Sequence, residues 1–168
     1  MTQSPTDAPV PASEHADYLL QAVDLARRGV ASGEGGPFGA LVVRDGEVLG
    51  EGWNRVLGTN DPTAHAEVTA IRAACERLGS FQLTGAVVYA SCEPCPMCLG
   101  AVYWARPTAL YYAATRHDAA AAGFSDAMIY DEIGMPPDDR TVPFRQLEVP
   151  GGADVFAQWL AKDDRTDY

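Results

Sequence analysis

The central motif of this chain reads Asp61-Pro62-Thr63-Ala64-His65-Ala66-Glu67, and a second motif further along reads Pro94-Cys95-Pro96-Met97-Cys98. One imidazole and two thiolates form a ligand set that zinc favours. Three protein ligands leave the fourth tetrahedral position to water, and Glu67 could move protons for that water without binding the metal. The motifs therefore predict a catalytic site with about one Zn²⁺ per chain, held by His65, Cys95 and Cys98.

The first motif is expected to open a helix. Asp61 or Thr63 can cap this helix, and Gly79 stops it. His65 and Glu67 would then lie on the first helical turn. Because a helix N-terminus carries partial positive charge, this position would help to keep Glu67 ionised.

The second motif is expected to open another helix, because Pro96 is tolerated only in a first turn. Cys95 and Cys98 are three residues apart and share one face of that turn. Cys92 has the same spacing from Cys95, but it follows a strand-like run and is expected in the loop before the helix. Cys98 is therefore the preferred ligand, and Cys75 is expected to be a core thiol.

Each residue alone has a simpler interpretation. A single histidine in a helix usually binds no metal, and C-x-x-C pairs also occur in redox and structural metal sites. A structural zinc would need a fourth protein ligand, and the sequence offers none in an obvious place. The combination of the two motifs with Glu67 favours the catalytic interpretation.

Length and composition set further limits. A chain of 168 residues that is 47% hydrophobic can bury a substantial core, so residues 15–168 are expected to form one domain after a disordered tail of residues 1–14. No stretch approaches a membrane span, and four cysteines in an ordinary composition indicate a reducing, cytoplasmic location. The net charge of -11 argues against nucleic-acid partners and favours a small neutral substrate.

Hydrophobic periodicity predicts an α/β fold. The expected elements are a helix at 16–31, strands at 37–43 and 47–54, the histidine helix, a strand at 86–90, the cysteine helix and a strand at 109–113. A strand followed by a helix twice over implies parallel crossovers, and hence a three-layer α/β/α sandwich with a mixed central sheet. Beyond Ala114 the pattern weakens, with helices expected at 118–122, 126–133 and 155–162 and a strand or extended segment at 142–149.

With these motifs the chain, from about Asp17 to Tyr168, resembles the bacterial guanine deaminases of the cytidine-deaminase-like superfamily. The similar stretches are Asn60 to Arg72, Ser91 to Gly100, Tyr103-Trp104-Ala105-Arg106-Pro107, Asp118 to Asp126 and the closing Tyr168. The zinc motifs are shared across the superfamily. The later stretches point to this branch.

The resemblance implies hydrolysis of guanine to xanthine and ammonia, in purine catabolism or salvage, by a homodimer. It implies that residues 150–168 form a C-terminal helix and tail exchanged between the subunits. It further implies that Asp126 assists Glu67 in proton transfer. The residues implied to contact the base are Phe38, Asn54, Ala66, Trp104 and Tyr168, the last of which would close over the site.

Other activities remain open from the sequence. A tRNA adenosine deaminase shares the metal site, but it would need a basic surface for its polyanionic substrate. Cytosine or cytidine deaminases share the chemistry, and guanosine or an aminotriazine such as ammeline could enter a similar pocket. A zinc-stabilised binding protein with no activity would have no need of Glu67.

Overall fold

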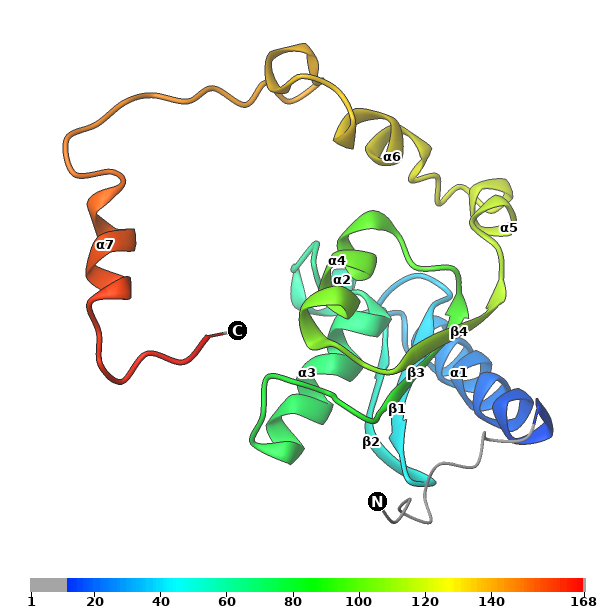
Figure 1. The fold of residues 1–168 in the computed structure, drawn as a ribbon. Helices are drawn as coiled ribbons and strands as arrows, with labels where there is room; N and C mark the ends of the chain where they lie inside the picture. Colours follow the sequence, from blue (N-terminus) through cyan, green and yellow to red (C-terminus); the bar gives the residue numbers. More distant parts are fainter. Residues whose placement is uncertain (1–11, 168) are drawn as a thin grey trace. The chain divides into compact units, whose positions relative to one another are not determined.

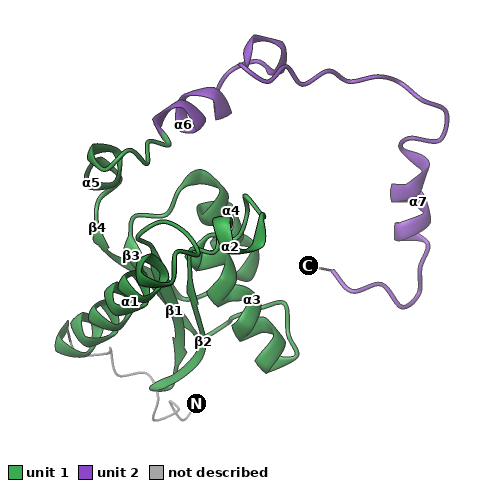
Figure 2. Cartoon of the chain, turned by 180° about the vertical axis from the view of Figure 1, so that it is seen from behind, with its two compact units in different colours: residues 1–126 green, residues 127–168 purple. Residues whose placement is uncertain are grey.

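The computed structural model describes residues 12–167, and the chain divides into two compact units, residues 1–126 and residues 127–168 (Figure 2). Of the expected disordered tail, residues 1–11 lie outside the described residues, whereas residues 12–14 begin the first helix. Tyr168, the expected closing residue, also lies outside the described residues.

The first unit has a four-stranded sheet between layers of helices (Figure 1). The strands are β1 (Gly39–Arg44), β2 (Glu47–Trp53), β3 (Val87–Cys92) and β4 (Ala109–Ala114), in the order β2-β1-β3-β4. β1 is antiparallel to both of its neighbours, whereas β3 and β4 are parallel. The sheet is therefore mixed, and a parallel crossover joins β3 to β4, which confirms the predicted α/β fold.

Helices cover both faces of this sheet. One face packs against α1 (Ala12–Ser32), and the other packs against α3 (Ala66–Leu78) and α4 (Pro96–Ala105). Two short helices, α2 (Val56–Thr59) and α5 (Arg116–Ala121), lie in the connections. α5 begins earlier than expected because Thr115 caps it, in a reciprocal capping box with Asp118.

The central strand β1 shows why this sequence forms a sandwich. Ala40 and Val42 are buried in the cluster shared with α3, whereas Leu41 and Val43 are buried in the cluster shared with α1. Because side chains alternate between the two faces of a strand, one continuous apolar run fills both clusters. The sheet is therefore a buried middle layer.

The topology also gathers several of the predicted site residues at one edge of the sheet. β2, β3 and β4 run in the same direction, and they end at the edge where the antiparallel strand β1 begins. Phe38 directly precedes β1, Asn54 directly follows β2, and Cys95 lies just beyond the end of β3. In open α/β sheets this edge is where ligands bind.

Two glycines in β2 allow α3 to lie unusually close to the sheet. A Cβ atom at Gly50 would lie 2.4 Å from the carbonyl oxygen of Ala70, and one at Gly52 would lie 2.6 Å from that of Ala66. Both distances are far shorter than an ordinary van der Waals contact, so no other residue fits without movement. The glycines thereby set the position of the N-terminal turn of α3.

The second unit contains α6 (Ala127–Ile133), a 3-10 turn η1 (Pro137–Asp139) and α7 (Asp154–Leu160). Residues 142–149 have no strand pairing, so the extended alternative holds for this segment. None of the described residues of this unit is buried. No helix within residues 12–167 is long and apolar enough to cross a membrane.

Candidate metal centre

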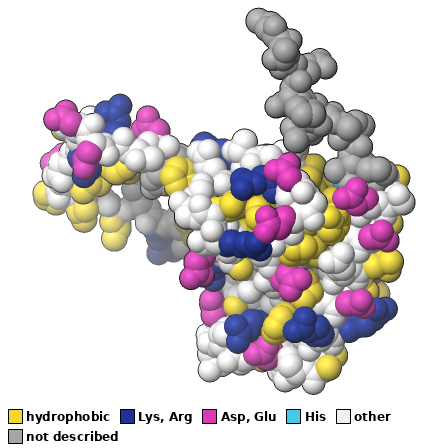
Figure 3. Space-filling model, turned by 90° about the horizontal axis from the view of Figure 1, so that it is seen from below, with side chains coloured by type: hydrophobic (Ala, Val, Ile, Leu, Met, Phe, Trp, Pro, Cys, Tyr) yellow, Lys and Arg dark blue, Asp and Glu magenta, His cyan; other side chains and the backbone are white. Residues whose placement is uncertain are grey.

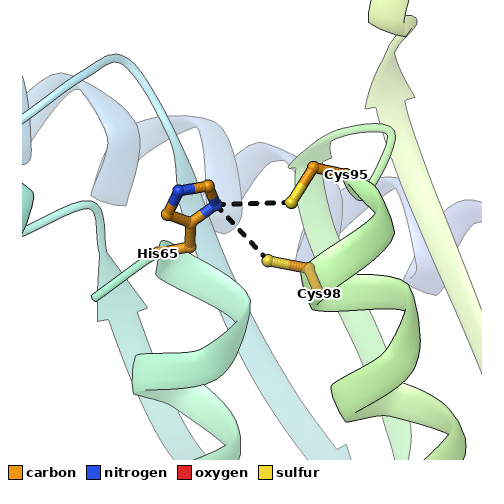
Figure 4. Close-up of side chains that lie close together, drawn as sticks. All are labelled: His65, Cys95 and Cys98. Carbon is orange, nitrogen blue, oxygen red and sulfur yellow. Dashed lines mark hydrogen bonds between the residues drawn. The ribbon is translucent and has the colours of Figure 1, made fainter. Parts of the chain in front are cut away.

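Three side chains from two helix N-termini converge in the first unit (Figure 4). His65 is the N-cap of α3, Cys95 is the N-cap of α4, and Cys98 lies in the first turn of α4. His65 Nδ1 lies 3.5 Å from the Sγ atom of each cysteine. The three ligand atoms all lie within 4.8 Å of one another.

This geometry fits zinc. Bonds of about 2.3 Å to sulfur and about 2.1 Å to nitrogen, at the tetrahedral angle, separate the two ligand atoms by about 3.6 Å. The 3.5 Å separations match that value. Within the described residues no fourth histidine, cysteine or carboxylate joins the group, which leaves one coordination position for water.

The electrostatics of the three ligands favour thiolate formation. A hydrogen bond from Cys98, assisted by the His65 imidazole, lowers the pKa of Cys95 to about 4. The same hydrogen bond raises the pKa of Cys98, and the hydrogen bond with Cys95 raises the pKa of His65. These hydrogen bonds favour the thiolate form of Cys95, and a divalent cation would stabilise a second thiolate at Cys98.

Glu67 lies beside this group and does not belong to it. It occupies the first turn of α3, is only 7% exposed and hydrogen-bonds with the Cys98 side chain. Burial raises the pKa of this carboxyl group, because the charged form loses solvation. A buried carboxyl group next to an open metal position can transfer protons without competition from bulk water.

The structure corrects where the histidine helix begins. α3 starts at Ala66, and His65 has extended backbone angles (φ −69°, ψ 158°), so its expected place within the first turn was wrong. The carboxylate of Asp61 accepts hydrogen bonds from the backbone N–H (2.8 Å) and hydroxyl (2.7 Å) of Thr63. These local bonds form a turn before the helix, so neither of the expected caps begins α3.

The position expected for Cys92 was also wrong. Cys92 is the last residue of β3 and pairs with Ala114 of β4, so it lies in the sheet and not in the loop. It is buried, its Sγ atom lies 3.5 Å from the carbonyl oxygen of Thr115, and burial raises the pKa of its thiol to about 11. These features suit an inert thiol.

Two of the residues expected to contact the base, Asn54 and Ala66, are buried. Asn54 is only 6% exposed, and its Oδ1 atom accepts hydrogen bonds from the N–H groups of Gly36 (3.3 Å) and Val56 (3.2 Å). Ala66 is fully buried as the first residue of α3, between His65 and Glu67. The N–H groups of a first helical turn have no partner within the helix and are available to a ligand.

Phe38 packs edge-on against Phe124, with ring centroids 5.0 Å apart. Both rings line a hollow of about 520 Å³ between α1 and α5, whose floor includes Ser91 and Cys92. The metal ligands do not line this hollow. Phe124 was not expected at the site, and its only signal in the sequence was an aromatic residue just before Asp126.

The structure assigns no role to three further residues expected at the site. Trp104 lies on α4 and is 67% exposed. Asp126 is half-buried at the end of the first unit, and no hydrogen bond or ion pair described for residues 12–167 joins it to the metal ligands. Tyr168 lies outside the described residues. The roles expected for these three residues therefore remain predictions.

The sequence-based interpretation missed Glu34. Its carboxylate accepts hydrogen bonds from Trp53 Nε1 (2.5 Å) and Arg55 Nη2 (3.1 Å), the two residues that flank Asn54. The available signal was a single charged residue among the glycines of the stretch Gly33-Glu34-Gly35-Gly36. These hydrogen bonds hold the pKa of the Glu34 carboxyl below its usual value, with the Trp53 bond contributing most.

Comparisons with known proteins agree with this geometry. Residues 12–114 match the model of the family described as the cytidine and deoxycytidylate deaminase zinc-binding region. The chain is 53% identical over 154 residues to the guanine deaminase of Bacillus subtilis, an alignment that covers 92% of this chain and 99% of that protein.

The X-ray structure of the Bacillus subtilis guanine deaminase superposes with a TM-score of 0.90, over 92% of this chain and 98% of that one. A more distant relative is the tRNA-specific adenosine deaminase of Haemophilus influenzae, which is 36% identical over 131 residues, 77% of this chain and 75% of that protein. The chain therefore belongs to the zinc-binding family of cytidine and deoxycytidylate deaminases, together with the guanine deaminase of Bacillus subtilis.

Proposed function

We propose that this protein catalyses the zinc-dependent hydrolytic deamination of guanine to xanthine and ammonia. The observation that carries the proposal is the buried carboxyl group of Glu67 beside a three-ligand metal site with one open position. Similarity to the Bacillus subtilis guanine deaminase over nearly the whole of both chains supports guanine as the substrate.

His65, Cys95 and Cys98 would hold a zinc ion, which would lower the pKa of a bound water toward neutrality. Glu67 accepts the proton that the attacking water loses as its oxygen bonds to the guanine carbon that bears the exocyclic amine. Glu67 delivers this proton to the neighbouring ring nitrogen. It then takes the proton of the hydroxyl group formed on the attacked carbon and passes it to the leaving amine, so that ammonia departs as the carbonyl group of the product forms. In this scheme Asp126 assists the proton transfers, as expected from the resemblance.

The base is held by groups at the same edge of the sheet. The amide NH₂ of Asn54 donates to the base, and the N–H of Ala66 at the start of α3 offers a second donor. The ring of Phe38 supplies a stacking surface. The resemblance implies a second one from Trp104, which lies near the end of α4 away from the metal ligands. Tyr168 closes over the base and excludes water during attack.

The rival function is the deamination of adenosine in tRNA, which the relative from Haemophilus influenzae represents. The surface of this chain does not favour a polyanion, because 23 acidic residues outnumber 12 basic ones. On the face shown in Figure 3, basic side chains lie among acidic ones. A small neutral base is therefore the better substrate.

Ammonia release from guanine, guanosine, adenine, cytosine, cytidine and ammeline, measured with one zinc-loaded preparation, tests the proposal. We expect kcat/KM for guanine to exceed that for each of the other compounds by about 100-fold, because a pocket that pairs polar groups with one base leaves them unpaired with another. In the same preparation no tRNA binding is expected at physiological salt. A tight tRNA complex that weakens as salt rises would exclude the free-base function.

We infer that the second unit serves a homodimer in the cytoplasm. Its large apolar side chains are mostly exposed, among them Leu147 (82%), Phe156 (69%) and Leu160 (65%), and a unit of this kind gains stability by packing on another surface. The segment 150–168, exchanged with a second copy of this chain, would provide that packing and bring Tyr168 to a site. The four free cysteines suit a reducing compartment.

Deletion of residues 164–168 is expected to lower kcat/KM for guanine about 100-fold, because the closing ring that excludes water is lost. Zinc content and the mass of two chains, measured by light scattering, should not change. Tyr168→Ala should reproduce the loss, whereas Asp164→Ala, which removes an exposed partner of Lys162, should not. Equal kcat/KM in the truncated and full-length proteins would withdraw the role of Tyr168.

A further inference from the structure

The side chain of Asn54 is held in a single amide orientation. Both of its described hydrogen bonds reach the Oδ1 atom, from the N–H groups of Gly36 (3.3 Å) and Val56 (3.2 Å). Both partners are donors, so only the amide oxygen can face them. The NH₂ group must therefore point away from them, and Asn54 offers a hydrogen-bond donor to a ligand and no acceptor.

The glycine loop, residues 33–36, closes tightly around this amide. A Cβ atom at Gly35 would lie 2.1 Å from Asn54 Oδ1 and 2.4 Å from the backbone oxygen of the same residue. No side chain fits at Gly35 without displacing Asn54. The loop is thus shaped to bring a backbone donor to the amide oxygen.

Glu34, in the same loop, holds the chain on both sides of Asn54. Its carboxylate binds the indole of Trp53 (2.5 Å) and the guanidinium of Arg55 (3.1 Å), which are the two sequence neighbours of Asn54. Its backbone oxygen accepts the N–H groups of Leu57 and Gly58, each at 2.9 Å. The Glu34 side chain is only 26% exposed, so these charge-assisted bonds are partly shielded from water.

The segment that Glu34 holds is joined to the metal centre. The N–H of Asn54 donates to the carbonyl oxygen of Phe38 (3.0 Å), and the N–H of Arg55 donates to that of Ala64 (2.9 Å), the residue before His65. Movement of this segment would therefore change the position of the Asn54 amide relative to the metal ligands.

We propose that Glu34 is a positioning residue for substrate recognition: it holds Trp53 and Arg55 so that Asn54 presents only its NH₂ group to the base. A fixed donor favours a base whose facing edge carries acceptors, as the edge of a 6-oxo purine does. It disfavours a base with an exocyclic amine at that position, because two donors would then face each other. This inference rests on the proposed function for the identity of the base. Glu34 itself does not contact the substrate.

A double-mutant cycle with Glu34→Ala and Asn54→Ala tests this role. Glu34→Ala should raise KM for guanine about tenfold with kcat within about twofold, because a binding contact is weakened and the proton transfers are not. Asn54→Ala should lower kcat/KM about 100-fold, and the double variant should lose no more than that, since Glu34 acts through Asn54. Independent losses that multiply in the double variant would overturn the assignment.

Two further variants separate positioning from general stability. Glu34→Gln keeps one of the two oxygen acceptors, so it can still bind Trp53 or Arg55 but not both, and its KM should lie between those of the wild type and Glu34→Ala. Glu47→Ala is the matched control, because Glu47 is also an ion-paired glutamate, bound to Arg77 at the opposite end of β2. Its kinetics should equal those of the wild type. A KM in Glu34→Gln as high as in Glu34→Ala would count against the positioning role of Glu34.

A readout independent of turnover separates this inference from the proposed function. The side-chain NH₂ signal of Asn54 in ¹⁵N NMR, assigned by its absence in Asn54→Ala, should move in Glu34→Ala and stay in place in Glu47→Ala. An unmoved signal would overturn the positioning role. If the signal moves in Glu34→Ala but the wild type fails to deaminate guanine, the proposed function is rejected and the positioning role of Glu34 is retained.

Discussion

Glu67→Gln is expected to retain about one zinc per chain and to lose about a hundredfold to ten-thousandfold in guanine turnover, the range that a positioned proton-transfer group supplies. Glutamine has nearly the same shape as glutamate, so it can fill the buried space beside Cys98. It cannot accept the proton of the attacking water. Because Glu67 is not among the metal ligands, the zinc site should remain intact.

Zinc content by atomic absorption and steady-state kcat for guanine, measured on the same sample, test this expectation. Glu76→Gln is the matched control, since Glu76 lies on the same helix α3 but is exposed, and it should behave as the wild type. His65→Ala should lose both zinc and turnover. If Glu67→Gln also lost zinc, or kept near-normal turnover, Glu67 would have a different role.

The second large effect concerns the choice between the cysteines. Cys98→Ser is expected to bind less than about a tenth of a zinc per chain and to have no measurable turnover, because a serine hydroxyl does not replace a zinc-bound thiolate. Cys92→Ser should keep both properties. Its Sγ atom faces the carbonyl oxygen of Thr115, whereas that of Cys98 faces His65 Nδ1 at 3.5 Å.

Both serine variants should fold, because the apolar clusters on the two faces of the sheet do not depend on the metal. Circular dichroism establishes this before zinc is measured. Zinc retained in Cys98→Ser but lost in Cys92→Ser would mean that the metal uses the other C-x-x-C pair.

The layers of the fold were predictable because they depend on local patterns. The apolar runs of β1 and β3 require burial on both faces, and prolines mark the start of α4. The start of α3 was not predictable, because the caps at Asp61 and Thr63 compete with a turn that these residues form with each other. The extension of β3 to Cys92 depends on pairing with Ala114, which is a tertiary contact.

The same distinction applies to the site. His65, Cys95 and Cys98 were found because metal ligation requires particular side chains at particular spacings. Glu34 was missed because its role arises only when the β1–β2 hairpin brings residue 34 against residues 53 and 55. No composition or period within a short window carries that information.

The glycine at position 52 has a consequence for the metal, although it contacts no ligand. A Cβ atom there would have to retreat from 2.6 Å to at least 3.4 Å from the oxygen of Ala66, a shift of about 0.8 Å imposed on the residue next to His65. Zinc–ligand distances tolerate errors of only about 0.2 Å. Because Gly52 has no Cβ atom, α3 can pack close enough to β2 to keep His65 within reach of the metal. Metal affinity in this enzyme therefore depends in part on how closely helix and strand pack.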